Sequence, residues 1–162
     1  MAALERANLL AAQEVSLAQE LWDEAVSLAY RLNELFERSG DWADRRRALK
    51  AGIEAARESE KQRDEAGLAH NLGVLAQDTG DYGEARRLYG ESLDIAEQLG
   101  DRAGVAKSLH QLGVLAEEDG NLREAERLFA ESLATFEALG SPNAEIARRS
   151  LERVRERMLS SD

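Results

Sequence analysis

The two histidines are the side chains of this sequence with the most versatile chemistry. Imidazole titrates near neutral pH and binds transition metals, so a pair could move protons or hold a metal ion. His70 and His110 lie 40 residues apart, and the chain has no cysteine. Because a zinc site needs three or four ligands, a metal would also need carboxylates, for which the candidates are Glu34, Asp78, Glu117 and Glu118. We predict no metal site. The pair either hydrogen-bonds a partner or is inherited through a repeat without a role.

Other groups give catalysis little support. The carboxylates of Glu117-Glu118-Asp119 stand just before Gly120, which is typical of a solvated helix end. Ser92 and Ser132 occupy equivalent positions where close packing needs a small residue. The glycines are spread along the chain rather than clustered as in a phosphate-binding loop. We therefore predict no catalytic residues, no cofactor and no enzymatic activity.

An internal repeat defines the elements that must position these side chains. Residues 61–100 align with residues 101–140 without a gap, and about 18 of roughly 40 positions are identical. Leu72-Gly73-Val74-Leu75-Ala76, for example, falls on Leu112-Gly113-Val114-Leu115-Ala116. Residues 21–60 form a more divergent first copy.

Each repeat is predicted to contain two helices. Apolar residues recur at steps of three and four residues from 62 to 79, and again from residue 82 onward. Gly80-Asp81 and Gly100-Asp101 separate the helices. Glycine suits the left-handed residue that ends a helix, and aspartate caps the next one.

These residues resemble the tetratricopeptide repeat. The residues that carry the resemblance are Leu72-Gly73, Ala76, Gly80, Ala85 and Tyr89, followed by Leu112-Gly113, Ala116, Gly120, Ala125 and Phe129. The resemblance implies an all-α, right-handed α-solenoid of antiparallel helix pairs with about eight helices. In such pairs Gly73 and Gly113 allow a close approach of the two helices, and Tyr89 and Phe129 fill the space between successive pairs.

The repeat also departs from the usual pattern of the family. The period is about 40 residues instead of 34, and Glu97 and Glu137 replace the proline that closes the second helix. This longer form resembles repeats of bacterial signal-transducing NTPases and regulators and of kinesin light chains. In the first repeat Asn33 replaces the helix glycine and Phe36 the small residue, so we expect wider packing or displaced helices there.

We expect a single repeat domain over residues 1–162. Its parts are an N-terminal helix (1–20), repeats at 21–60, 61–100 and 101–140, and a C-terminal capping helix (141–162). Ser141 and Pro142 are predicted to begin the last helix. The N-terminal helix lacks a partner of its own, so either the chain is cut from a longer protein or this helix is a native cap. The capping helix carries a basic face, which is either solvated or docks an acidic partner; its residues are Arg148, Arg149, Arg153, Arg155 and Arg157.

Composition narrows the class of partner. The chain has 32 acidic and 21 basic residues and a net charge of −11, which argues against nucleic acids and anionic membranes. No apolar stretch is long enough to span a bilayer. The absence of cysteine is compatible with a reducing cytoplasm, which is the expected location.

The resemblance implies a partner-binding groove on the concave face, formed by the first helix of each repeat. Its residues are Tyr30, Arg31 and Glu34 in the first repeat, His70, Asn71, Val74 and Gln77 in the second, and Lys107, His110, Gln111, Val114 and Glu117 in the third. Asn71 matches the groove asparagine that holds a peptide backbone in many such repeats. The basic groove of chaperone-binding members is not reproduced, because only Arg31 and Lys107 are candidates.

Three functions are compatible with the sequence. The chain could be a protein- or peptide-binding scaffold, as the interaction or sensor part of a larger bacterial regulator. It could instead be a self-assembly module whose ends stack head to tail. A small-molecule or metal-binding enzyme is the third possibility.

Overall fold

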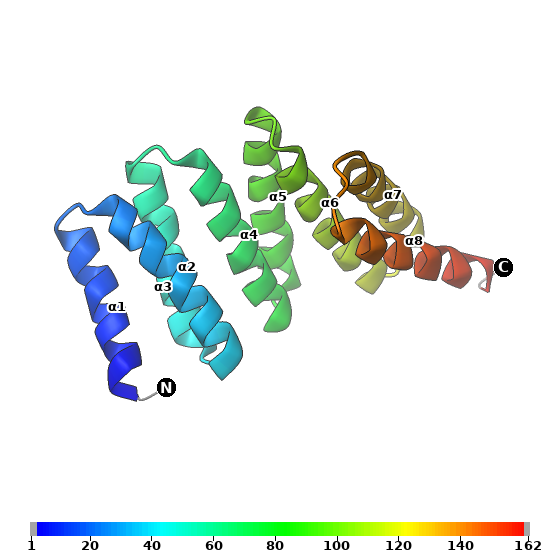
Figure 1. Cartoon of the computed structure of the whole chain (residues 1–162). Helices are drawn as coiled ribbons and strands as arrows, with labels where there is room; N and C mark the ends of the chain where they lie inside the picture. The colour runs from blue at the N-terminus through cyan, green and yellow to red at the C-terminus, as the bar shows by residue number, and fades with distance from the viewer. Residues whose placement is uncertain (1–2, 161–162) are drawn as a thin grey trace. The chain divides into compact units, whose positions relative to one another are not determined.

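The computed structural model describes residues 3–160, and over that range the chain forms eight α-helices and no strand (Figure 1). The helices are α1 (Ala3–Ala18), α2 (Trp22–Ser39), α3 (Trp42–Glu58), α4 (Gln62–Asp78), α5 (Tyr82–Gln98), α6 (Arg102–Glu118), α7 (Leu122–Ala138) and α8 (Asn143–Leu159). The all-α class and the number of helices agree with the sequence prediction.

The turns recur every 20 residues. Gly40, Gly80, Gly100, Gly120 and Gly140 all have positive φ angles between 62° and 78°. At the helix starts, the side chains of Asp81, Asp101 and Asn121 accept hydrogen bonds from the backbone N–H three residues later. The prediction that glycine ends a helix and that a short polar residue caps the next one is therefore confirmed at these turns. The last helix begins at Asn143, slightly later than expected, and Ser141 Oγ accepts from the Asn143 N–H.

Glu60 stands where the other repeats have glycine, and its φ is 55°. A left-handed conformation costs a residue with a Cβ roughly 1 kcal/mol. We expect Glu60→Gly to raise the free energy of unfolding by about 0.5–1 kcal/mol, measured by urea denaturation. Gly100→Ala, at the equivalent turn with φ 65°, should change it in the opposite direction.

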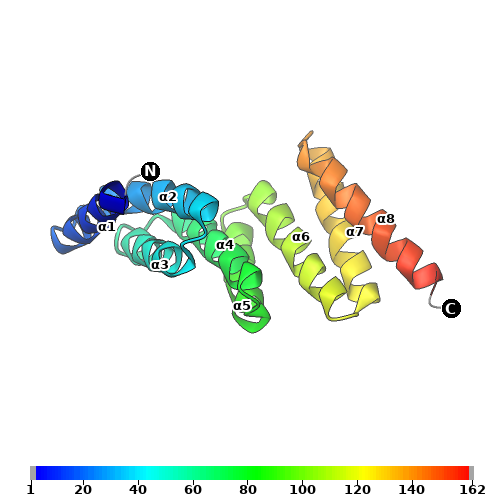
Figure 2. The ribbon, with the colours of Figure 1, turned by 90° about the horizontal axis from the view of Figure 1, so that it is seen from below.

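The chain divides into two compact units, residues 1–88 and 89–162, of which residues 3–88 and 89–160 are described. In the first unit α2 packs on α3, α3 on α4, and α1 against both α2 and α3. Figure 2 shows α2 and α3 in two layers. Their shared core contains Leu32, Phe36 and Ala48, all fully buried.

The first repeat accommodates its two unusual residues in different ways: Phe36 is buried in the core, and Asn33 is paired with Arg45. Phe36 is fully buried in the core beside α1. Asn33 accepts a hydrogen bond of 2.9 Å from Nε of Arg45, which is itself 1% exposed. Arg45 stands 40 residues before Ala85, so a guanidinium and an amide occupy the places that alanine and glycine hold in the second repeat.

The helices of the first repeat still approach closely at another point. A Cβ at Gly52 of α3 would lie 2.3 Å from the Cβ of Ala29 in α2. Wider packing, as expected from Asn33 and Phe36, is therefore not found at this point. Gly52 occupies the same repeat position as Ser92 and Ser132, where small residues are also used.

In the second unit α6 packs on α7, and α7 on α8. Phe129 of α7 is fully buried, and its ring would lie 2.8 Å from a Cβ at Gly113 of α6. Gly113 thus permits the nesting predicted from the repeat. Ser132 is also buried, and its hydroxyl donates to the Ala106 carbonyl at 2.7 Å, so packing and a hydrogen bond account for this serine.

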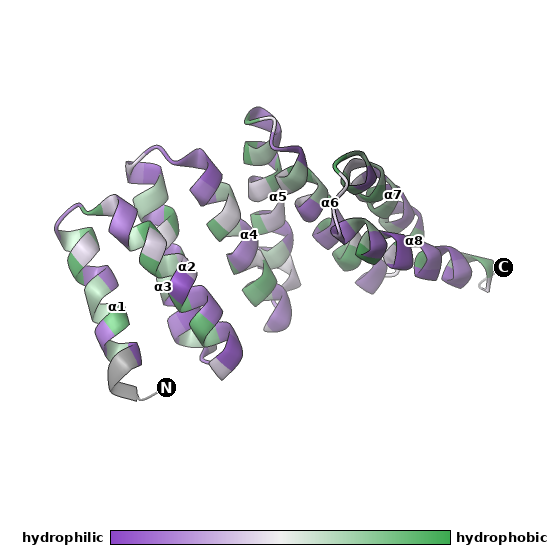
Figure 3. Cartoon of the chain, in the orientation of Figure 1, coloured by the Kyte–Doolittle hydropathy of each residue, from purple (hydrophilic) through white to green (hydrophobic). Residues whose placement is uncertain are grey.

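Hydrophilic and hydrophobic residues alternate along the helices (Figure 3). Apolar residues of these helices form the buried core, and most charged residues are exposed, as in amphipathic helices that build a shared core. Among residues 3–160, the structure has no helix with the length and apolarity that crossing a bilayer requires.

Candidate functional site

Seven of the predicted groove residues lie in the first unit, on two helices. Tyr30, Arg31 and Glu34 are on α2, and His70, Asn71, Val74 and Gln77 are on α4. Arg31 and Glu34 are exposed, whereas the other five are partly buried. His70 and Gln77 each have an interaction partner within the chain.

Tyr30 connects α2 to α4. Its hydroxyl lies 3.4 Å from both the carbonyl oxygen and Oδ1 of Asp64. A Cβ at Gly67 would lie 2.7 Å from that hydroxyl, so the glycine makes room for the ring. Burial, followed by the negative charge of Asp64, raises the pKa of Tyr30 to about 12. The one predicted groove aromatic therefore already has a structural role between two helices.

The other five predicted residues lie in the second unit, on α6. Lys107 is exposed, and Gln111 and Val114 are partly buried. Gln111 donates to the Tyr89 hydroxyl at 3.2 Å. His110 lies 3.2 Å from the hydroxyl of Ser150 on α8 and packs beside Phe129, with ring centroids 5.2 Å apart. Burial lowers the pKa of His110, and the positive charge of Arg153 acts in the same direction.

Glu117 is held by the capping helix. It is 7% exposed and accepts hydrogen bonds of 2.6–2.9 Å from Arg153 and of 2.8 Å from Arg157. These bonds, those from Arg153 first, lower the pKa of Glu117. A carboxylate in the last turn of α6 faces the negative end of the helix dipole, and the two guanidiniums offset that repulsion.

The basic face of α8 is not simply solvated. Arg148 pairs with Glu137 and Glu145, Arg149 with Glu145, and Arg155 with Glu126. Together with Arg153 and Arg157, all five arginines bind carboxylates of this chain. The sequence left two alternatives, a solvated face or a dock for an acidic partner, and neither included these internal pairs. Their physical reason is the acidic surface of α6 and α7, on which α8 packs.

Acid is expected to destabilise the second unit in two steps. Burial holds the pKa of His110 below the usual histidine value of 6.5, so the unfolded chain binds the extra proton as pH falls through that value, and stability declines. Glu117 has a lowered pKa in the folded state, so its contribution is lost as pH falls below the usual glutamate value of 4.5 toward that lowered pKa. Urea denaturation between neutral and acidic pH measures both steps.

Two variants separate these contributions. His110→Gln should flatten the first step and leave the second, whereas Glu117→Gln should do the reverse. A first step that is unchanged in His110→Gln would show that another group is responsible.

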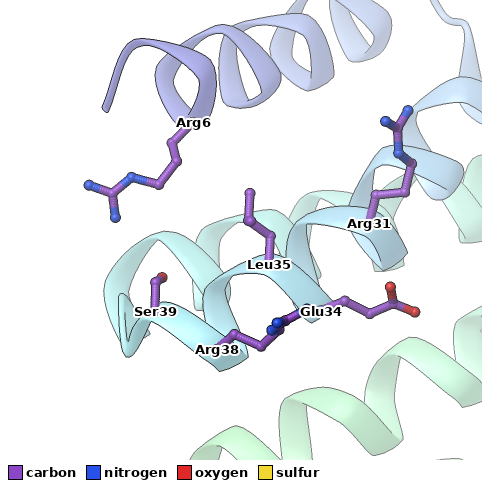
Figure 4. A pocket seen from close by; sticks show the side chains of 6 residues that line it. All are labelled: Arg6, Arg31, Glu34, Leu35, Arg38 and Ser39. Carbon is purple, nitrogen blue, oxygen red and sulfur yellow. The ribbon is translucent and has the colours of Figure 1, made fainter. Parts of the chain in front are cut away.

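A hollow at α1 and α2 was not predicted from the sequence. It has a volume of about 470 Å³ and is lined by Arg6, Arg31, Glu34, Leu35, Arg38 and Ser39 (Figure 4). Only Arg31 and Glu34 were among the predicted site residues. The seven-residue spacing of Arg31 and Arg38 could have indicated one helix face, but nothing local relates Arg6 to them.

The predicted residues thus form two sets in two units, and a continuous groove that joins them stays a prediction. Among the side chains of residues 6–160, no three histidine, aspartate or glutamate side chains converge as metal ligands would. The two units offer a repeated helix pair, partly exposed polar residues on its first helices, and an arginine-lined hollow. These features make a surface that can contact another molecule.

Comparison with known proteins identifies the class of fold. Residues 64–138 match the model of the tetratricopeptide repeat family. The resemblance deduced from the sequence is confirmed for this segment, and the chain has the all-α architecture of a tetratricopeptide-type solenoid. No curated protein matches the sequence.

Two solved structures share this fold. The apo form of RapI superposes with a TM-score of 0.82 at 14% identity, over 97% of this chain and 46% of RapI. BtubC (BKLC) from P. vanneervenii superposes with a TM-score of 0.63 at 19% identity, over 85% of this chain and 65% of BtubC. The chain therefore spans less than two thirds of either protein.

Proposed function

We propose that this chain is a protein- or peptide-binding scaffold that contacts its partner through the first helices of its repeats, α2, α4 and α6. Tetratricopeptide repeats generally serve as non-catalytic scaffolds for protein interactions, and residues 64–138 match that family. In a bacterial cell the chain would be the interaction or sensor part of a larger cytoplasmic regulator.

The observation that carries this proposal is the set of polar side chains on these helices that the core does not use. Arg31, Glu34 and Lys107 are exposed, and Asn71 is partly buried at the surface of α4. A side-chain amide together with charges of both signs can bind the backbone of an extended peptide or the polar face of a partner's helix. Tyr30, His110 and Glu117 contribute less directly, because they already contact other helices of the chain.

Hydrogen exchange tests the proposal with a partner isolated by crosslinking from the native host. Bound partner should protect amides of α2, α4 and α6 more than those of α3, α5 and α7. The double variant Asn71→Ala/Lys107→Ala should weaken binding, whereas Glu54→Ala/Glu131→Ala, at exposed positions on second helices, should not. The proposal would be wrong if both double variants lost the same affinity for the partner, or if the partner protected only the second helices from exchange.

Self-assembly is the second candidate, and exposed apolar residues on the two end helices favour it. Val15 of α1 is 52% exposed, and Ile146 and Leu159 of α8 are 57% and 80% exposed. End-to-end stacking would cover both surfaces. Sedimentation velocity across the micromolar range tests it: stacking predicts growing species that Ile146→Glu abolishes, and a monomer throughout would contradict it.

A further inference from the structure

The hollow on α1 and α2 combines an apolar floor with a basic rim. Leu35 points from α2 toward α1 (Figure 4) and packs against the buried core of the first repeat. Arg31 and Arg38 are seven residues apart on α2, which corresponds to about 10.5 Å along the helix axis. Arg6 comes from α1 and lines the same hollow.

The charges of this hollow differ from those of α8. Among the side chains of residues 6–160, none forms a hydrogen bond or ion pair with Arg31 or Arg38, whereas every arginine of α8 is paired with a carboxylate. Glu34 is the one acidic residue of the lining. A chain with a net charge of −11 thus concentrates unneutralised positive charge beside an apolar side chain.

Arg6 is held at the rim of the hollow by Asp41, which does not cap the following helix as the equivalent aspartates do. Asp81 and Asp101 use their carboxylates to cap the following helix, but Asp41 makes no such bond to α3. Its carboxylate instead pairs with Arg6 and accepts a hydrogen bond of 2.6 Å from Ser39. Arg6 therefore lines the hollow with its charge already paired to Asp41, whereas Arg31 and Arg38 supply the charge that a partner could use.

The opposite flank of α2 is already covered. Tyr30 contacts Gly67 and Asp64 of α4 there, whereas Arg31, Leu35 and Arg38 lie on another flank and line the hollow with Arg6 of α1. On the Tyr30 flank of α2, the neighbour within this unit is the helix α4. A helix is therefore the shape that fits beside α2.

We propose that this hollow binds an acidic helical segment of a partner protein, with an apolar side chain on Leu35 and carboxylates on Arg31 and Arg38. A helix with carboxylates at positions i and i+7 reproduces the spacing of the two guanidiniums, and residues i+3 and i+4 between them face the same way. Each arginine can bind a carboxylate through two parallel hydrogen bonds. The inference deepens the proposed function, since it names the chemistry of the partner.

A fluorescein-labelled, alanine-based synthetic helix tests the proposal, with glutamate at i and i+7 and leucine at i+3 and i+4. Fluorescence anisotropy should show saturable binding that salt weakens. Arg31→Gln/Arg38→Gln should weaken it about tenfold, or by about 1.4 kcal/mol. Arg63→Gln/Arg123→Gln is the matched control, because it removes the same charge from exposed arginines elsewhere.

A second peptide, with glutamine in place of both glutamates, should bind about tenfold more weakly. No saturable binding, equal affinity for the two peptides, or an equal loss in the control pair would overturn the inference. The proposed function fails separately: a natural partner that depends on Asn71 and Lys107 but not on Arg38 leaves the scaffold proposal in place and removes this one.

Discussion

Gly52→Ala is expected to lower the free energy of unfolding of the first unit by about 2–3 kcal/mol. The new Cβ would lie 2.3 Å from the Cβ of Ala29 and 3.0 Å from Cδ1 of Leu68. A Cβ cannot rotate away from its backbone, so α2 and α3 would have to separate. Urea denaturation and hydrogen exchange of α2 and α3 measure the loss.

Two further variants test whether the loss comes from the contact between Gly52 and Ala29: Gly90→Ala, at an uncrowded glycine, and Ala29→Gly. Gly90 lies inside α5, and a Cβ added there would have no atom within 4 Å, so Gly90→Ala should stabilise the chain by about 0.5–1 kcal/mol. Ala29→Gly removes the Cβ that Gly52→Ala meets, so the double variant should be more stable than the sum of the single changes predicts. Strict additivity would show that the two positions do not clash.

Arg45→Ala is expected to cost about 3 kcal/mol, because it opens a cavity and leaves a buried amide without its partner. The guanidinium is 1% exposed, donates to Asn33 at 2.9 Å, and lies 3.4 Å from Glu37 and 3.7 Å from Asp78. It therefore ties the ends of α2 and α4 to α3. Thermal or urea denaturation measures the change.

Arg47→Ala is the matched control two residues away. Arg47 is 59% exposed and pairs with Glu14, which is 54% exposed, so its loss should cost less than about 1 kcal/mol. Similar costs for the two variants would mean that Arg45 does not support the first repeat. A much larger cost for Arg45→Ala would show that the polar contacts of Arg45 stabilise the first repeat at the position where the second repeat has alanine.

Two of the five predicted site residues on α6 have partners on α8. Glu117 and His110 were predicted for a partner, yet α8 supplies Arg153, Arg157 and Ser150 to them. The capping helix thus satisfies polar groups of α6 from within the chain. A partner that uses α6 would have Lys107, which is exposed, as its most accessible contact.

The sequence by itself determined the helices and their order. The apolar period of three and four residues predicts the helices, and the glycines at positions 40, 80, 100, 120 and 140 predict where five of them end. These signals are local, because a left-handed turn and an amphipathic stripe depend on neighbouring residues alone. Gly113 and Ser132 could be interpreted in the same way, since the repeat itself shows that small residues recur there.

Only the tertiary structure decided which polar side chains are free and which are used. The pairs Arg45–Asn33 and Arg153–Glu117 join different helices, and Arg6 lines the same hollow as Arg31 and Arg38 only because α1 packs on α2. Such pairings depend on distances between helices, which the helical period does not contain. The sequence therefore defined the scaffold, whereas packing decided which of its charges remain available to a partner.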